Sequence, residues 1–359
     1  MKITKIKNEL EKLKIDAILI APSEELRLIL GYSPMAISRF QGLFILKTGE
    51  IFYICNILNY FELKKNFGEK LEIFSWSDEE SYAEKVKEIF ENKNLIGKKI
   101  LVNSNVLAKH IIDIGELTKV EFFNGDKFLI NQRIIKNKEE ILKLKKACEI
   151  TDKSFKEILK YIKVGVTELE LKTKLKEIIK EKGGIPRNPV VSFGENTAYP
   201  HYIGEKGILK EKDIILIDFG CIYDGFNSDM TRTIFVGDIT EEERKIYNIV
   251  LNANLIAEKN IKEGLEIKKL DEYARNHIQE FGYGKYFITR LGHGIGLSLH
   301  EEPEISLLNK RKLEKGMTFT VEPGIYIPEK FGIRIEDDIA LTDEGVELLT
   351  KTPKEIIIL

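Results

Sequence analysis

Residues 214–236 read IILIDFGCIYDGFNSDMTRTIFV, two apolar runs separated by a polar, glycine-containing segment. The first run contains Asp218, and the second begins just after Asp229, eleven residues later. Gly220 and Gly225 lie between the two acids and indicate a turn. A carboxylate at the end of a buried strand is costly unless it is paired or binds a metal. We therefore predict two strands that fold back on each other and bring both acids to one place. For either acid alone, the alternative is a turn or cap residue, or an ion pair with an arginine of the second run.

Two histidines follow in a glycine-rich segment. His293 lies within residues 292–296 (GHGIG), and His300 follows seven residues later. Glycines around a histidine allow a close backbone approach, as a cramped site needs. The G-x-G-x-G spacing does not match the dinucleotide-binding fingerprint G-x-G-x-x-G. We interpret the segment as part of a catalytic or metal site rather than a nucleotide site.

Two more acids interrupt strand-like runs near the end of the chain. Glu322 directly follows the strand-like residues 319–321 (FTV), and Glu336 follows residues 332–335 (GIRI). With the two aspartates and His293 they form a set of mainly oxygen ligands, which suits Mn²⁺ or the borderline ions Co²⁺ and Zn²⁺. Five protein ligands exceed what one ion uses in a catalytic zinc site. We therefore predict two divalent ions, ~3.5–4 Å apart, with Mn²⁺ first and Co²⁺ or Zn²⁺ as alternatives.

These residues and their flanks resemble the M24 family of pita-bread metallopeptidases, which includes methionine aminopeptidase, aminopeptidase P, Xaa-Pro dipeptidase (prolidase) and creatinase. The resemblance runs from about Arg133 to the C-terminus and implies an α+β pita-bread catalytic domain. Five motifs, IDFG, SDMTRT, GHGIGL, VEPGIY and GIRIEDD, occur in the family's order and contain Asp218, Asp229, His293, Glu322 and Glu336 in turn.

The first part of the chain resembles the creatinase-type amino domain. Helix and strand signals alternate there, and residues 26–33 (LRLILGYS) resemble the strand-crossing segment of that domain. We expect an α/β two-domain protein with a creatinase-like α/β domain at residues 1–128 and the catalytic domain at residues 129–359. A sizeable amino domain favours the proline-peptidase branch, Xaa-Pro dipeptidase or aminopeptidase P, over methionine aminopeptidase. The intact ligand set disfavours creatinase, which dispenses with it.

The resemblance also implies a role for each ligand. Asp218 and Asp229 would hold one ion, Asp229, His293 and Glu322 the other, and Glu336 would bridge the two. A water bridging two cations becomes an attacking hydroxide at neutral pH. Glu322 is in addition the expected general base and acid, carrying the water proton to the leaving amine.

Three further residues receive roles by the same resemblance. His300 is expected to stabilise the tetrahedral oxyanion. His201 ends the segment GENTAYPH (residues 194–201), which matches a substrate-contacting segment of the family. Arg334 is expected to orient Glu336 or Asp229.

The implied reaction is hydrolysis of the Xaa-Pro bond, at the N-terminus of peptides or in Xaa-Pro dipeptides. This bond is a tertiary amide with slow cis/trans exchange, which ordinary peptidases handle poorly. Two positions depart from the family pattern: Thr289 stands where many proline peptidases carry a histidine, and Glu304 where some dipeptidases carry a basic residue. If that residue binds the substrate's terminal carboxylate, Glu304 argues against a strict dipeptidase. The alternatives are a methionine aminopeptidase-like enzyme and, in another class, a non-catalytic pita-bread scaffold that binds peptides.

Composition sets the remaining bounds. The 359 residues are 43% hydrophobic and 32% charged, which excludes wholesale disorder. A net charge of -2 leaves no electrostatic footprint for nucleic acid or an anionic membrane. The start lacks the apolar core of a signal peptide, and we expect Cys55, Cys148 and Cys221 to be buried in a reducing compartment. We therefore expect a cytoplasmic protein whose partner is a proline-containing peptide, with a homodimer implied by the family.

Overall fold

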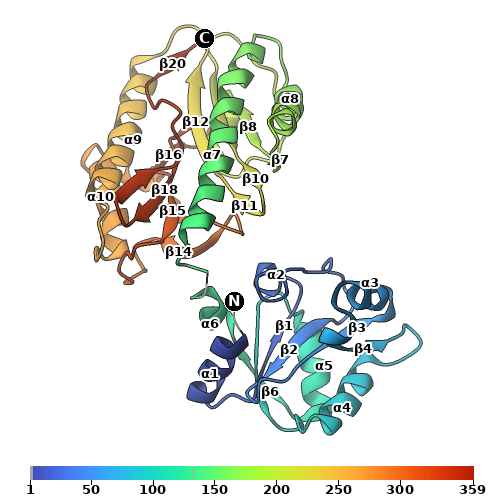
Figure 1. The fold of residues 1–359 in the computed structure, drawn as a ribbon. Helices are drawn as coiled ribbons and strands as arrows, with labels where there is room; N and C mark the ends of the chain where they lie inside the picture. The colour runs from blue at the N-terminus through green and yellow to red at the C-terminus, as the bar shows by residue number, and fades with distance from the viewer. Residues whose placement is uncertain (1–2, 132) are drawn as a thin grey trace. The chain divides into compact units, whose positions relative to one another are not determined.

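The computed structural model describes residues 3–131 and 133–359. The chain divides into two compact units, Met1–Gln132 and Arg133–Leu359 (Figure 1). The expected boundary between residues 128 and 129 falls inside helix α6 (Asp126–Ile130), which belongs to the first unit. Residues 1 and 2, where the first expected domain starts, lie outside the described part. No helix in that part is both long and apolar enough to cross a membrane.

The first unit is a six-stranded mixed sheet with helices, in the strand order β4-β3-β2-β1-β5-β6. The strands are β1 (Ala17–Ile20), β2 (Gly42–Leu46), β3 (Ile51–Asn56), β4 (Glu72–Trp76), β5 (Lys99–Val102) and β6 (Glu121–Asn124). The helices are α1 (Ile3–Leu13), α2 (Glu24–Leu30), α3 (Ile57–Phe67), α4 (Tyr82–Asn92), α5 (Ala108–Thr118) and α6, with the short 3₁₀ helix η1 (Gly68–Lys70).

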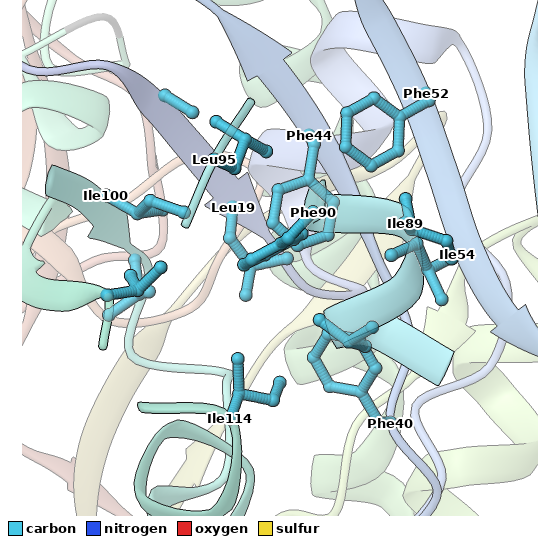
Figure 2. Close-up of a cluster of buried hydrophobic side chains, with 14 of the residues drawn as sticks. Leu19, Phe40, Phe44, Phe52, Ile54, Ile89, Phe90, Leu95, Ile100 and Ile114 are labelled. Carbon is cyan, nitrogen blue, oxygen red and sulfur yellow. The ribbon is translucent and has the colours of Figure 1, made fainter. Parts of the chain in front are cut away.

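Both faces of this sheet are buried, which explains the uninterrupted apolar sequence of β1. Ala17 and Leu19 pack into one hydrophobic cluster, whereas Ile18 and Ile20 pack into the other. This alternation is the two-residue period of a strand, and a strand covered on both faces is apolar throughout. Figure 2 shows the first cluster, where the ring of Phe44 stacks on that of Phe52 with 4.9 Å between centroids.

The segment expected to cross the strands is a helix for most of its length. Ser23 caps α2 by accepting a hydrogen bond from the backbone N–H of Leu26, and Gly31 ends the helix in the left-handed conformation. Residues 26–30 are therefore helical.

The second unit combines four helices with several small sheets. The helices are α7 (Lys138–Ile158), α8 (Glu168–Glu181), α9 (Glu241–Asn260) and α10 (Ile267–Glu280), with the 3₁₀ helices η2 (Leu159–Tyr161), η3 (Gly194–Ala198) and η4 (Gly284–Tyr286). The strands are β7 (Ile185–Pro186), β8 (Val190–Phe193), β9 (Ile214–Phe219), β10 (Cys221–Tyr223), β11 (Phe226–Asn227), β12 (Met230–Phe235), β13 (Gly292–Gly294), β14 (Glu301–Ile305), β15 (Thr318–Val321), β16 (Gly324–Ile327), β17 (Phe331–Arg334), β18 (Asp337–Thr342), β19 (Gly345–Leu348) and β20 (Ile357–Ile358).

Two of these sheets carry the candidate site. One has the order β20-β12-β9-β8 and the other β14-β13-β15-β18-β19. Helices α7, α8 and α9 of this unit (Figure 1) begin at capping boxes. Thr167 with Glu170 and Thr240 with Glu243 form two of these boxes, which satisfy backbone N–H groups that the first helical turn leaves unpaired.

Candidate metal centre

Strands β9 and β12 place the two aspartates side by side. They pair antiparallel with Asp218 opposite Thr231, and Asp229 directly precedes β12. The connection requires glycine at position 220, since a Cβ there would lie 1.7 Å from the carbonyl oxygen of Ser228. The folded-back arrangement predicted from the spacing of the two acids is therefore confirmed.

The second sheet contributes the other acids and the histidine. In the antiparallel pair β15–β18, Val321 lies opposite Asp337, so Glu322 and Glu336 emerge at the same end. β13, which contains His293, pairs with the other edge of β15. The backbone N–H of Glu336 donates to the carbonyl oxygen of Thr231 at 3.1 Å, which joins the two sheets at this point.

The side chains converge closely enough to share metal ions. In each of three sets, one ligand atom from every residue lies within 4.8 Å of the others. The sets are Asp218 with Asp229 and Glu336; His293 with Glu322 and Glu336; and Asp229 with His293 and His300. Asp229, His293 and Glu336 each belong to two sets, as expected of ligands that serve a pair of ions.

His293 is held as a neutral ligand. Its Nδ1 lies 3.0 Å from the carbonyl oxygen of Gly294, which only accepts, so Nδ1 carries the proton. The unprotonated Nε2 then faces Glu322 at 3.3 Å and Asp229 at 3.8 Å. Burial lowers the pKa of His293 to about 4, so the ring stays neutral and keeps its lone pair at neutral pH.

The buried carboxylates of the site outnumber the positively charged side chains beside them. Burial, followed by repulsion from Asp218, raises the pKa of Asp229 well above its usual value. Burial and the charge of Asp229 do the same for Glu336, and burial raises the pKa of Glu322. Acids buried together ionise readily only when a cation joins them. Divalent cations fit this oxygen-rich donor set.

Arg334 forms an ion pair with Asp218. Its Nη2 donates to Asp218, its Nη1 to the hydroxyl of Tyr326 at 2.7 Å, and its Nε to Thr231 Oγ1 at 2.9 Å. Glu336 accepts from the hydroxyl of Thr231 at 2.5 Å, so Arg334 reaches Glu336 through that threonine. That Arg334 orients Glu336 or Asp229 stays a prediction.

All eight site residues predicted from the sequence line one cavity of about 180 Å³. His201 and His300 lie at its exposed side, whereas His293 and Glu336 are buried. The rings of His293 and His300 meet edge to face with 4.3 Å between their centroids. Partial burial and the neighbouring ring of His293 lower the pKa of His300 to about 4, so it is neutral at neutral pH. The cavity is also lined by Arg187, which sequence reasoning missed.

A buried glutamate holds the loop that carries His201. Glu168, the first residue of α8, is fully buried, and its carboxylate accepts four hydrogen bonds. The donors are the backbone N–H groups of Phe193 and Gly207, the side-chain amide of Asn196 and the hydroxyl of Tyr202, at 2.9–3.1 Å. These donors span the segment on both sides of His201. Sequence alone shows an acid in the first turn of a helix, which the helix dipole already favours.

Replacing Glu168 by glutamine should lower kcat/KM about 10- to 100-fold, the range typical of groups that hold a site residue in place. The amide keeps the shape but turns a donor toward N–H and O–H groups that need acceptors. Bound metal should not change, because Glu168 is not in any of the ligand sets. The matched control is Glu177→Gln, an exposed acid on the same helix. Equal activity of the two variants would contradict the positioning role.

The stability of the metal-free protein should fall as pH rises. Burial raises the pKa of Asp338, whose carboxylate accepts from the backbone N–H of Asp229, from 3.8 to about 8. Between these values the folded state binds more protons than the unfolded state, so the free energy of unfolding decreases with pH. The raised pKa values of Asp229 and Glu336 act in the same direction.

Thermal melting at about pH 5.5 and about pH 7.5, with chelator or with Mn²⁺, checks this prediction. We expect the metal-free protein to have a lower melting temperature at the higher pH. Bound cations should remove the part of this difference that comes from the ligand carboxylates. A melting temperature of the metal-free protein that rises with pH would contradict the raised pKa values of these buried carboxylates.

Comparison with known proteins adds independent findings. The family model of metallopeptidase family M24 matches residues 142–343, and that of the creatinase/prolidase N-terminal domain matches residues 2–135. The chain is 37% identical over 362 residues to the Xaa-Pro dipeptidase of Pyrococcus horikoshii, covering 99% of this chain and 98% of that protein. For the Xaa-Pro dipeptidase of Pyrococcus furiosus the identity is 35%, with coverage of 98% and 100%. The crystal structure of recombinant prolidase from Thermococcus sibiricus matches with a TM-score of 0.94 at 34% identity, covering 99% of this chain and 98% of that one.

Proposed function

The chain belongs to metallopeptidase family M24 and is a peptidase, and from this premise we propose that it hydrolyses the Xaa-Pro bond of peptides with proline in second position. One observation carries the proposal. The carboxylates and histidines expected for dinuclear hydrolysis line a single cavity, in a chain similar over its whole length to Xaa-Pro dipeptidases. The predictions of the family and of the two-domain α/β fold are confirmed.

The proposed metal ligands are Asp218, Asp229, His293, Glu322 and Glu336. Their mainly oxygen donors favour Mn²⁺, with Co²⁺ or Zn²⁺ as alternatives. Two divalent ions, when bound there, lower the pKa of a coordinated water and polarise the scissile carbonyl.

The protein side chains supply proton transfer and positioning. Glu322 accepts the proton of the attacking water and delivers it to the proline nitrogen, which leaves as a secondary amine. The hydroxyl of Thr320 donates to Glu322 Oε1 at 3.1 Å and holds that carboxylate in position. His300 donates to the carbonyl oxygen of the substrate as negative charge develops there. His201 contacts the substrate from the loop that Glu168 holds.

We also propose a cytoplasmic homodimer. The balanced charge and the lack of a membrane-spanning helix among the described residues are compatible with this location. The dimer follows from the family resemblance alone. Light scattering coupled to size-exclusion chromatography tests it, and a monomer at micromolar concentration would contradict it.

The test of function is a cleavage assay with chelator-treated and Mn²⁺-loaded enzyme. The substrates are Met-Pro, a Met-Pro-Xaa series and Met-Ala peptides. We expect metal-dependent cleavage before proline and its loss in Glu322→Gln and His300→Ala. Release of methionine from Met-Ala with none from Met-Pro would support the methionine aminopeptidase alternative. If the metal-loaded protein turned over none of these substrates, the result would contradict the peptidase proposal and support the alternative of a non-catalytic peptide-binding scaffold.

A further inference from the structure

A dipeptide substrate brings a negative charge that needs a positive partner in the pocket. Cleavage at Xaa-Pro in a dipeptide requires the terminal carboxylate to enter a cavity lined by Asp218, Asp229, Glu322 and Glu336. The two proposed cations offset these four acids, so the terminal carboxylate needs a further cation where water is partly excluded. A basic residue at position 304 could pair with the terminal carboxylate, but this chain has Glu304 there. Glu304 forms an ion pair with Arg290 at 3.1 Å. Another cation must therefore serve if dipeptides are substrates.

Among the described residues that line the cavity, two carry a permanent positive charge, Arg187 and Arg334. Arg334 is already engaged within the protein, because each of its three guanidinium nitrogens donates to a protein oxygen, one of them on Asp218. Its charge is therefore neutralised within the protein. This leaves Arg187 as the cation available to a ligand.

Arg187 is held in place by a neutral partner. Its Nη1 donates to the side-chain oxygen of Asn227 at 2.6 Å, the one side-chain partner that the described residues give it. Asn227 is itself almost fully buried and donates to the carbonyl oxygens of Gly296 and Leu297 at 3.0 and 2.8 Å. The guanidinium is thus fixed beside the loop that leads to His300. An amide orients it but does not cancel its charge, and the remaining N–H groups stay available.

We propose that Arg187 binds the C-terminal carboxylate of an Xaa-Pro dipeptide and makes dipeptides the preferred substrates; this inference rests on the proposed function. A guanidinium binds a carboxylate through two parallel hydrogen bonds, which fixes orientation as well as charge.

The test compares Met-Pro with Met-Pro-amide, which differs only in lacking the terminal negative charge. Wild type should prefer Met-Pro. In Arg187→Gln we expect KM for Met-Pro to rise about 10- to 100-fold, the range for a lost hydrogen bond to a charged group. KM for Met-Pro-amide and kcat for both substrates should stay close to wild type. Arg187→Lys should keep part of the preference, because lysine retains the charge without the paired donors.

Arg290→Gln is the matched control, because it removes an arginine charge near the site that is already paired with Glu304. It should leave the preference for Met-Pro intact. A second readout does not depend on turnover: calorimetric titration of metal-loaded protein with L-proline and L-prolinamide. Wild type should bind L-proline more tightly, and Arg187→Gln should bind the two alike.

The outcomes separate the two claims. Failure of wild type to cleave both Met-Pro and Met-Pro-amide would overturn the proposed function. Cleavage of both without preference, or a preference that persists in Arg187→Gln, would overturn the role of Arg187 alone. Equal loss for both substrates in Arg187→Gln and Arg187→Lys would show a merely structural role and would also overturn it.

Discussion

Asp229→Asn is expected to lose its bound metal, and its activity should fall more than about 100-fold. Residues that only support metal ligands cost at most about 100-fold when they are replaced, and a ligand itself should cost more. Asp229 belongs to two of the three convergent ligand sets, so both proposed ions lose a ligand in this variant. Asparagine has nearly the same shape but cannot bridge two cations or supply a negative charge. Metal analysis after dialysis, together with Met-Pro hydrolysis, measures both losses.

The same substitution should not destabilise the metal-free protein. Burial and neighbouring acids raise the pKa of Asp229, so a neutral side chain removes repulsion at that position. Its backbone N–H still donates to Asp338 at 2.8 Å, which keeps the chain in place. Asp224→Asn, an exposed aspartate in the turn between β10 and β11, is the matched control and should keep both metal and activity. Full metal content in Asp229→Asn would contradict the assigned ligand set.

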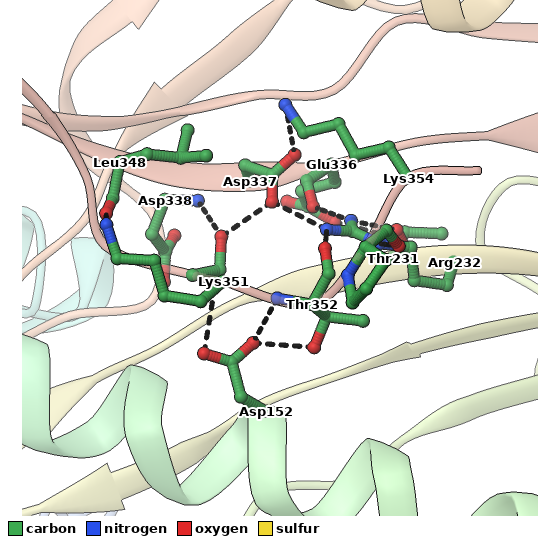
Figure 3. A network of polar contacts seen from close by, with 12 residues as sticks. Asp152, Thr231, Arg232, Glu336, Asp337, Asp338, Leu348, Lys351, Thr352 and Lys354 are labelled. Atoms are coloured by element: carbon green, nitrogen blue, oxygen red, sulfur yellow. Dashed lines mark hydrogen bonds and ion pairs between the residues drawn. The ribbon is translucent and has the colours of Figure 1, made fainter.

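The second large effect concerns stability, and its source is Arg232. This side chain is 1% exposed, and it donates five hydrogen bonds (Figure 3). The acceptors, at 2.6–3.0 Å, are Asp337 and the carbonyl oxygens of Thr231, Glu336, Thr352 and Pro353. All five guanidinium N–H groups are thus used, and the arginine joins β12 to the segment after β19.

Arg232→Met should lower the free energy of unfolding by about 3–5 kcal/mol, the cost of breaking a buried ion pair on one side. Asp337, which is fully buried, would keep Thr350 and Lys354 but lose its arginine. For a unit of this size the melting temperature should fall by about 6–20 °C. Activity should fall as well, because Arg232 holds the backbone carbonyl of the proposed ligand Glu336.

Lys351→Met is the control for this variant. Lys351 lies in the same network (Figure 3) but is exposed, and its ammonium donates to the carbonyl oxygen of Leu348. A surface change of this kind should stay within about 0.5 kcal/mol. Chemical denaturation of both variants measures the difference. A loss below about 1 kcal/mol in Arg232→Met would contradict the structural role given to the arginine.

Features encoded over short distances were predictable from the sequence. The turn between Asp218 and Asp229 follows from its glycines, and the capping boxes at Thr167 and Thr240 follow from a three-residue spacing. The amphipathic helix α10 was also encoded in this way: Ile267, Leu270, Ala274 and Ile278 form its buried face. It was missed although the signal was present.

Partners across the two sheets were not predictable. The ion pair of Arg334 with Asp218, 116 positions away in the sequence, was not predicted. Arg232, weighed as a partner for the first two aspartates, pairs with Asp337. The register between strands of different sheets decides both contacts, and no local pattern contains it.

The same reason explains the roles of Glu168 and Arg187. In the sequence, one is an acid at a helix start and the other a basic residue between two prolines. Each gains its role only through contacts with residues far away in the sequence. Glu168 accepts a hydrogen bond from Gly207, and Arg187 donates one to Asn227. The family motifs predicted which residues meet at the centre, but the residues that hold them there required the fold.

The most direct test of the central claim is a titration of Mn²⁺ into chelator-treated enzyme while Met-Pro hydrolysis is measured. Our account predicts that activity rises with bound metal and levels off at about two ions per chain. Asp229→Asn should show no such rise. Absence of hydrolysis in wild-type protein that has bound two ions would contradict the assignment of this centre as the catalytic site of an Xaa-Pro peptidase.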